Sequence, residues 1–260
     1  REVRWRRTTL YTLDTMAAEA ISDLVSVRPK GWSTSQEVVR ASNSKELFFA
    51  VVGHVGSGTS EVAEELQKIL KSPVAGPGYD VEILKARTEL EEWDGASGRG
   101  RLKEADRSKK FAYTELLQKV GNDMREGGDH AAVAAALIRR IRLTRALKTR
   151  HDPTAGGPVQ PDGQPRAYIL DSIRHPAEVE LLTRIYQDAF VLLGVVCDES
   201  IRSERLLKVK FREAGPDDIQ DFMERDAKEV PKHGQRVSDA FHLSHYFLDN
   251  TQDRGPAGKP

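Results

Sequence analysis

The stretch AVVGHVGSGTS, residues 50–60, places a glycine-rich turn between an apolar run and a helical pattern. The run that leads into it, KELFFAVVGH, has the continuous apolar composition of a strand buried on both faces of a parallel sheet. The segment after it has glutamates in its first turns and an apolar face made by Val62, Leu66, Ile69 and Leu70. The sequence therefore predicts a strand, a tight turn and a helix, which together aim backbone N–H groups at one point.

Strand and helix patterns alternate along the rest of the chain. Further strands are predicted at residues 79–86, 167–174, 189–198 and 245–251. Helices are predicted at residues 109–126, 130–148, 176–187, 200–215 and 217–229, and Pro176 suits a first helical turn. We expect the first of these helices to end near Gly121, and the fourth to be capped by Ser200 and stopped by Gly215. This alternation predicts an α/β fold, a doubly wound parallel sheet with flanking helices.

The chain divides into three parts by composition. Residues 1–45 are polar and irregular, with one weakly amphipathic stretch at residues 16–25, and are interpreted as an N-terminal arm. Residues 46–250 form the predicted domain, and residues 251–260 form a Pro/Gly-rich tail. Inside the domain, two polar glycine-rich segments, residues 91–110 and 151–166, are expected to be mobile surface excursions.

Composition excludes several classes of protein. Lys plus Arg and Asp plus Glu both number 40, so bulk charge does not favour a nucleic-acid or membrane-surface binder. Cys197 is the only cysteine, which excludes an internal disulfide and a zinc site built from several cysteines. No apolar run approaches the roughly 18 residues of a membrane span, and we expect a cytoplasmic protein. Because the sequence begins with Arg1 and not methionine, we expect a processed start or a piece of a longer chain.

The glycine turn has the spacing of a phosphate-binding loop. Gly53, Gly56 and Gly58 would let successive backbone N–H groups curl around a phosphate, because side chains resist the angles that such a curl requires. The spacing fits the usual loop pattern except that Thr59 stands where lysine is expected. Ser60 keeps the hydroxyl that would hold Mg²⁺ beside the nucleotide. The predicted nucleotide-binding loop is thus Gly53, His54, Val55, Gly56, Ser57, Gly58, Thr59 and Ser60; a tight turn with no ligand is the alternative.

The missing lysine is expected to affect catalysis more than binding. A charge-assisted contact contributes on the order of 1.5 to 3 kcal/mol, against about 1 kcal/mol for a neutral hydroxyl. Losing a group aimed at transition-state charge can lower a rate by on the order of a hundredfold or more. The resulting hypothesis is a nucleotide binder that is a poor or inactive kinase. Fast ATP-dependent phosphorylation of nucleotides would refute it.

Other polar residues are predicted near the same sheet edge. Asp171 ends a predicted strand at the carboxyl edge, where it would orient Mg²⁺ through water or act on a substrate hydroxyl; helix capping is the alternative. Arg174 follows on the same loop. Arg202 and Arg205 share a helix face and would clamp phosphates from a lid, although single arginines there are often solvated surface charges.

Three further residues and two other patterns complete the candidates. Asn122, Asp123 and Arg125 follow the predicted helix stop and would contact a base or a substrate phosphate; an Asx-capped turn explains the first two equally well. The histidines at 242 and 245 lack carboxylate or cysteine partners at ligand spacing, so no metal site is expected there. The basic run at residues 98–110 is interpreted as solvated loop, and contact with a phosphate is the alternative.

An ordered series of motifs resembles the N-terminal P-loop kinase-like half of bacterial anti-phage dCTP deaminases. The motifs are FFAVVGHVGSGTSEVAEEL, GNDMRE, AYILDSIRHPAEVELL, VVCDESIRSERL, FMERDAKE and KHGQRVSDAFHLSHYFLDNT, and they span about residues 45–252. The threonine in place of lysine is shared with that family. More distantly, the glycine loop, LDSIR and YFLDN are similar to nucleoside-monophosphate and dephospho-CoA kinases.

The resemblance implies a P-loop nucleotide-kinase-like fold that regulates a deaminase of dCTP or dCMP. It implies ATP or a deoxynucleotide as ligand, Mg²⁺ with that nucleotide, a C-terminal deaminase domain as partner, a homo-oligomer and an inhibitory regulator. Zn²⁺ would belong only to the deaminase domain, whose His-x-Glu and Pro-Cys-x-x-Cys motifs are absent from this sequence. Two alternatives stay open: a stand-alone nucleotide kinase that recruits another cation, such as Lys68 or a lid arginine, and an interaction module with an empty relict pocket.

Overall fold

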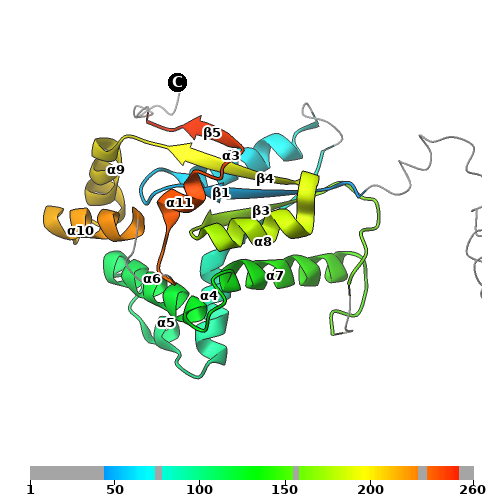
Figure 1. Cartoon of the computed structure of the whole chain (residues 1–260), viewed down its shortest axis with the longest axis horizontal. Helices are drawn as coiled ribbons and strands as arrows, with labels where there is room; N and C mark the ends of the chain where they lie inside the picture. The colour runs from blue at the N-terminus through cyan, green and yellow to red at the C-terminus, as the bar shows by residue number, and fades with distance from the viewer. Residues whose placement is uncertain (1–43, 74–77, 155–157, 228–232, 252–260) are drawn as a thin grey trace, which may run out of the picture. The chain divides into compact units, whose positions relative to one another are not determined.

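The described part of the chain is built on one parallel sheet. The computed structural model describes residues 44–73, 78–154, 158–227 and 233–251 (Figure 1). Five strands pair in the order β2-β3-β1-β4-β5, and every pair is parallel. They are β1 (Glu46–Val52), β2 (Asp80–Lys85), β3 (Arg166–Ile173), β4 (Phe190–Val196) and β5 (Tyr246–Asp249). This topology confirms the predicted doubly wound parallel sheet with flanking helices.

Helices cover the two faces of the sheet unequally. On one face lies α3 (Thr59–Lys71), whose Ala63 and Leu66 pack against Val51 and Ile169. On the other face lie α4 (Ala86–Ala96), α6 (Lys110–Glu126), α7 (Ala132–Lys148), α8 (Pro176–Tyr186) and α11 (Val237–Phe241). The predicted apolar face of α3 was wrong at Ile69, whose side chain is 56% exposed. The large core therefore lies between the sheet and the second set of helices.

A third cluster of buried residues lies beyond the carboxyl ends of the strands, toward which the arrowheads in Figure 1 point. It joins the glycine loop to α10 (Pro216–Ala227) and to the π-helical turn η3 (Leu206–Lys210), which directly follows α9 (Glu199–Arg205). The predicted helix at 200–215 was wrong at both ends. Its capping position is Asp198 and not Ser200, and buried Phe211 ends it before Gly215, because the wide turn draws that side chain into the cluster.

Helical turns occupy residues 91–96 and 101–104, inside the segment where a mobile excursion was expected. The end of α4 and the short α5 (Arg101–Glu104) both lie in this segment. Fully buried Asp94 accepts hydrogen bonds from the Leu102 amide at 2.8 Å and from Arg101 at 3.1 Å, and Leu102 is 1% exposed. One buried carboxylate thus organises a segment whose composition indicated a loop.

Gly121 does not end a helix, because α6 continues to Glu126. A Cβ on Gly121 would lie 3.3 Å from the Arg125 guanidinium and 3.7 Å from the Leu90 side chain. The glycine is needed for this close approach, and the predicted turn at Asn122 and Asp123 was wrong.

A bulge in β3 lies next to β1. Val51 pairs with Asp171 while the following residue, Val52, pairs with Ile173, which leaves Ser172 as the extra residue. Ser172 has a φ of 78°, a left-handed conformation that non-glycine residues rarely adopt. Bulges of this kind redirect side chains and are common beside functional sites.

The remaining elements and predictions concern the edges of the domain. A 3₁₀ turn, η2 (Gln187–Ala189), joins α8 to β4. At the other end of α8, the predicted first helical turn at Pro176 is confirmed, and His175 and Glu178 form a capping box there. The predicted helix at 16–25 lies outside the described residues. Within the described ranges, none of the helices has both the length and the apolar character needed to cross a membrane.

Candidate phosphate-binding site and adjoining pocket

The glycine loop between β1 and α3 adopts the curled conformation that its sequence predicts. Gly56 and Gly58 have φ angles of 83° and 90°, in the left-handed region. In the part of the chain that the structure describes, the backbone N–H groups of Gly56, Gly58, Thr59 and Ser60 donate no hydrogen bond. Their opening lies at the N-terminus of α3, where the helix dipole favours an anion. The loop can therefore supply a set of uncommitted donors to a phosphate.

The first residues of the loop anchor it to the neighbouring helices. The Val55 amide donates a 2.7 Å hydrogen bond to Asp226 of α10. His54 Nε2 lies 3.0 Å from the Ser238 hydroxyl of α11, and burial lowers the pKa of His54, as does the nearby Arg202. The Val55 amide and the His54 side chain are thus committed to holding the loop, whereas the open amides come from its second half.

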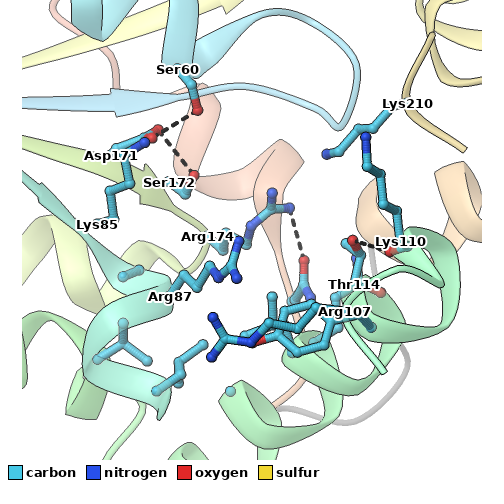
Figure 2. A pocket seen from close by; sticks show the side chains of 18 of the residues that line it. Ser60, Lys85, Arg87, Arg107, Lys110, Thr114, Asp171, Ser172, Arg174 and Lys210 are labelled. Carbon is cyan, nitrogen blue, oxygen red and sulfur yellow. Dashed lines mark hydrogen bonds between the residues drawn. The ribbon is translucent and has the colours of Figure 1, made fainter. Parts of the chain in front are cut away.

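Asp171 and Ser60 meet at the sheet edge as the sequence predicts. Ser60 Oγ donates a 2.8 Å hydrogen bond to Asp171 Oδ2, and the hydroxyl of the bulge residue Ser172 donates to Oδ1 at 3.1 Å (Figure 2). Asp171 is 3% exposed. Because the chain leaves β1 and β3 on opposite sides at this point, the residues lie at the topological switch point of the sheet, where ligands bind in such folds.

The oxygen atoms of Ser60 and Asp171 fit a magnesium ion held with a nucleotide. Mg²⁺ prefers oxygen ligands and is bound through one or two protein groups together with substrate phosphates. Asp171 has no arginine or lysine within ion-pair distance among the described residues, so its charge is available to a cation. The same part of the chain contains no cluster of three or more His, Cys, Asp or Glu residues that would hold a metal without a nucleotide.

Arg202 and Arg205, which were expected to act from a lid, lie on α9; the segment of α9 and η3, residues 199–210, is called the lid below. Arg202 donates to the Val55 carbonyl at 3.4 Å, and Arg205 donates to the Asn250 carbonyl at 3.0 Å and to Cys197 Sγ at 3.4 Å. Asn250 in turn donates to the Ser57 carbonyl at 2.9 Å. A cavity of about 500 Å³ opens over the loop, and Arg205 lines it. These contacts bring both arginines to the loop, although each is hydrogen-bonded to protein atoms.

A second cavity of about 400 Å³ adjoins the loop on the side of Asp171. Basic residues surround it (Figure 2), and sequence reasoning missed three of them: Lys85, Arg87 and Lys210. The strand pattern contained a signal for the first, because Lys85 ends β2 and is in register with Asp171. The cavity is therefore suited to an anionic small molecule.

Glu91 positions two of these arginines. It accepts hydrogen bonds from Arg87 Nε at 2.8 Å and from the Tyr113 hydroxyl at 2.6 Å, and Arg107 lies 3.2 Å away. The two guanidinium groups lie 4.9 and 5.6 Å from the Tyr113 ring centre. Although burial alone would raise it, the hydrogen bonds from Tyr113 and Arg87 lower the pKa of Glu91. The arginines are thus oriented before any ligand arrives.

Two other predicted residues line this cavity while paired with buried carboxylates. Arg174 donates to Asp226 and, at 3.0 Å, to Gln235. Arg125 forms a 2.7 Å ion pair with Glu178, and both side chains are buried. Asn122 and Asp123 are not among the lining residues.

Several remaining candidates lie elsewhere. Asp123 pairs with Arg99 and Arg101, and Lys68 forms an exposed pair with Glu65 at 2.8 Å. The basic run at 98–110 was only partly solvated loop, because its Arg107 and Lys110 line the cavity. His242 and His245 come after the end of α11 and are not part of that helix.

The sheet order, the curled loop and the Ser60–Asp171 pair define a kinase-like α/β domain of the P-loop class. A scan against protein-family models finds no match. The chain is 28% identical over 202 residues to a UPF0200/UPF0201 protein of Archaeoglobus fulgidus, which covers 78% of this chain and 50% of that protein. The chain thus spans about half the length of this curated relative.

A comparison with solved structures gives two matches at low TM-scores. TT1252 from Thermus thermophilus matches with 17% identity and a TM-score of 0.42, over 80% of this chain and 90% of that chain. Shikimate kinase from Acinetobacter baumannii in complex with shikimate matches with 12% identity and a TM-score of 0.36, over 84% of this chain and 90% of that chain.

Proposed function

We propose that this domain binds a nucleoside triphosphate at the glycine loop and a small anionic acceptor in the adjoining basic cavity, and transfers a phosphoryl group between them. The observation that carries the proposal is that the two cavities share a lining residue. Ser60 lines both the cavity over the loop and the basic cavity beside Asp171. A donor phosphate on the loop would therefore face an acceptor across a short gap, as in-line transfer requires.

Each part of the site has a distinct task in this proposal. The open amides of the loop and the N-terminus of α3 bind the donor phosphates. Ser60 and Asp171 would hold Mg²⁺, which when bound neutralises phosphate charge. Asp171 can also accept the proton of an acceptor hydroxyl, as the hydroxyl oxygen bonds to the terminal phosphorus of the nucleotide and the nucleoside diphosphate leaves. Arg87 and Arg107, held by Glu91, bind the acceptor's anionic group.

The direct test is a coupled ADP-release assay with ATP, Mg²⁺ and a panel of nucleoside monophosphates and other phosphorylated or carboxylated hydroxy compounds. We expect ADP release that depends on one class of acceptor. Calorimetry with ATP alone, and with each acceptor alone, measures the two sites separately. Absence of binding at both sites would contradict the proposal.

Replacing Arg107 with glutamine is expected to weaken acceptor binding by about ten- to a hundredfold and to leave ATP binding unchanged. The reason is the loss of one charge-assisted contact, about 1.5–3 kcal/mol, on the acceptor side only. Calorimetric titration with the acceptor found in the panel measures the change. Arg99→Gln is the matched control, because Arg99 is equally exposed in the same segment but pairs with Asp123 outside the cavity. Equal losses in the two variants would exclude a specific role for Arg107.

The second candidate is the nucleotide-binding regulatory half of an anti-phage dCTP or dCMP deaminase. Thr59 in the lysine position favours it, because a regulatory site needs affinity for a nucleotide and no phosphoryl transfer. This candidate predicts tight binding of ATP or a deoxynucleotide with no release of ADP for any acceptor. The basic cavity favours the first candidate, since a site that only senses one nucleotide has no need of a second anion-binding pocket.

A further inference from the structure

Lys210 occupies the last position of the π-helical turn that follows α9. In this turn the Phe211 amide donates to the Leu206 carbonyl at 2.7 Å, five residues back. Single π turns at the end of a helix widen the backbone and change the direction of the following side chains, and they are frequent at functional sites. The turn therefore determines where the Lys210 side chain points.

Packing fixes both the first residue of the turn, Leu206, and the residue that follows it, Phe211. Phe211 is fully buried, with its ring 5.4 Å from the Phe111 ring and 5.5 Å from the Phe222 ring. Leu206 is also fully buried. The Lys210 ammonium lies 5.0 Å from the Phe211 ring centre. The backbone that carries Lys210 is thus anchored in the apolar cluster between the lid and the loop.

The Lys210 side chain reaches the junction of the two cavities. Apart from Ser60, it is the residue that lines both the cavity over the glycine loop and the basic cavity. In Figure 2 its ammonium points into the space that Ser60 and Asp171 face, and the Lys110 side chain points into the same space. Among the described residues no carboxylate forms an ion pair with Lys210.

The surroundings of Lys210 favour an anion beside it. The residue is exposed and lines the cavity over the loop, although nearby protein atoms partly desolvate its ammonium group. Their presence lowers the pKa of Lys210, and the positive charge of Arg174 lowers it further, while Asp226 and Asp171 act in the opposite direction. A bound phosphate would supply the counter-charge that the protein itself provides only at a distance.

We propose that Lys210 supplies the cation that is missing at Thr59 and binds the terminal phosphate of the nucleotide at the junction of the two cavities. The inference rests on the proposed nucleotide binding at the loop. Thr59 cannot fill this role, since a hydroxyl carries no charge. A lysine from the lid differs from one in the loop, because it contacts phosphate only when the lid lies over the loop. Neither Lys68 nor the lid arginines are required for this contact.

The test compares Lys210→Met with Lys208→Met by calorimetry with ATP, ADP and AMP. Lys208 lies in the same turn but pairs with Glu204 and lines neither cavity, so its substitution is a matched control for charge. We expect Lys210→Met to bind ATP about ten- to a hundredfold more weakly and AMP nearly as the unmodified chain does. We expect Lys208→Met to bind all three nucleotides normally. Equal ATP affinity in the two variants would overturn the role of Lys210.

Two more variants separate a lost contact from a damaged fold. Lys210→Arg keeps the charge and should retain most of the ATP affinity. Adding Thr59→Lys to Lys210→Met should restore ATP affinity, because it returns a cation to the usual position of the loop. If neither variant recovers ATP affinity although its melting temperature is unchanged, the role of Lys210 is wrong. Nucleotide binding at the loop is not contradicted by that result. If the unmodified chain binds no nucleotide, the proposed function itself fails.

Discussion

Replacing Asp226 with alanine is expected to destabilise the domain by about 3–5 kcal/mol, because it leaves a partly buried charge without its partner. Asp226 is fully buried and connects three elements. It accepts from the Val55 amide of the loop at 2.7 Å, pairs with Arg174 after β3, and accepts from Gln118 of α6 at 3.4 Å. Its removal therefore also frees the start of the loop from α10.

Urea denaturation followed by circular dichroism measures this change. Asp221→Ala on the same helix is the control, since Asp221 is exposed and such surface substitutions usually change stability by less than about 0.5 kcal/mol. Asp226→Asn should fall between the two, because an amide oxygen can still accept from Val55 but carries no charge for Arg174. The interpretation of Asp226 as the connection between the loop and α10 would be wrong if Asp226→Ala and Asp221→Ala unfolded at the same urea concentration.

Replacing Gly58 with valine is expected to weaken nucleotide binding by about a hundredfold or more. Two costs combine at this position. The φ of 90° suits glycine, and a side chain adds about 1–2 kcal/mol of strain. A Cβ there would also lie 2.3 Å from Asn250 Nδ2, which displaces the amide that holds the Ser57 carbonyl. Distortion of the loop then removes hydrogen bonds to phosphate worth about 1 kcal/mol each.

Calorimetric titration with ATP measures the loss, and a second glycine provides the control. Gly98 also has a positive φ, 74°, but a Cβ there meets no atom within 4 Å. Gly98→Val therefore introduces similar backbone strain far from the loop and should leave ATP affinity unchanged. If Gly58→Val binds ATP as tightly as Gly98→Val does, the loop is not the phosphate-binding site.

The sequence was most informative where one local pattern determines the geometry. The strand, glycine turn and helix at residues 46–71 were predictable because apolar periodicity and glycine spacing act within a few residues. Asp171 was predictable for a related reason, since the carboxyl end of a buried parallel strand must reach the same edge as the loop.

The errors arise where tertiary contacts override composition. Gly95, Gly98 and Gly100 indicated a loop, yet the buried carboxylate of Asp94 folds this segment into helices. The basic cavity was predicted only in part, because its residues come from separate positions with no shared spacing. Lys210 could not be found from sequence, because its direction depends on a π turn that buries Phe211.

The donor and acceptor halves of this site are encoded in separate stretches of the chain. The glycine loop and the lid supply the nucleotide side, whereas Lys85, Arg87, Arg107 and Lys110 all fall between the end of β2 and the start of α6. Changes confined to residues 85–110 could therefore give the same scaffold a new acceptor without altering its phosphate donor. Relatives that share the loop motif need not act on the same compound, and this segment is where their chemistries are expected to diverge.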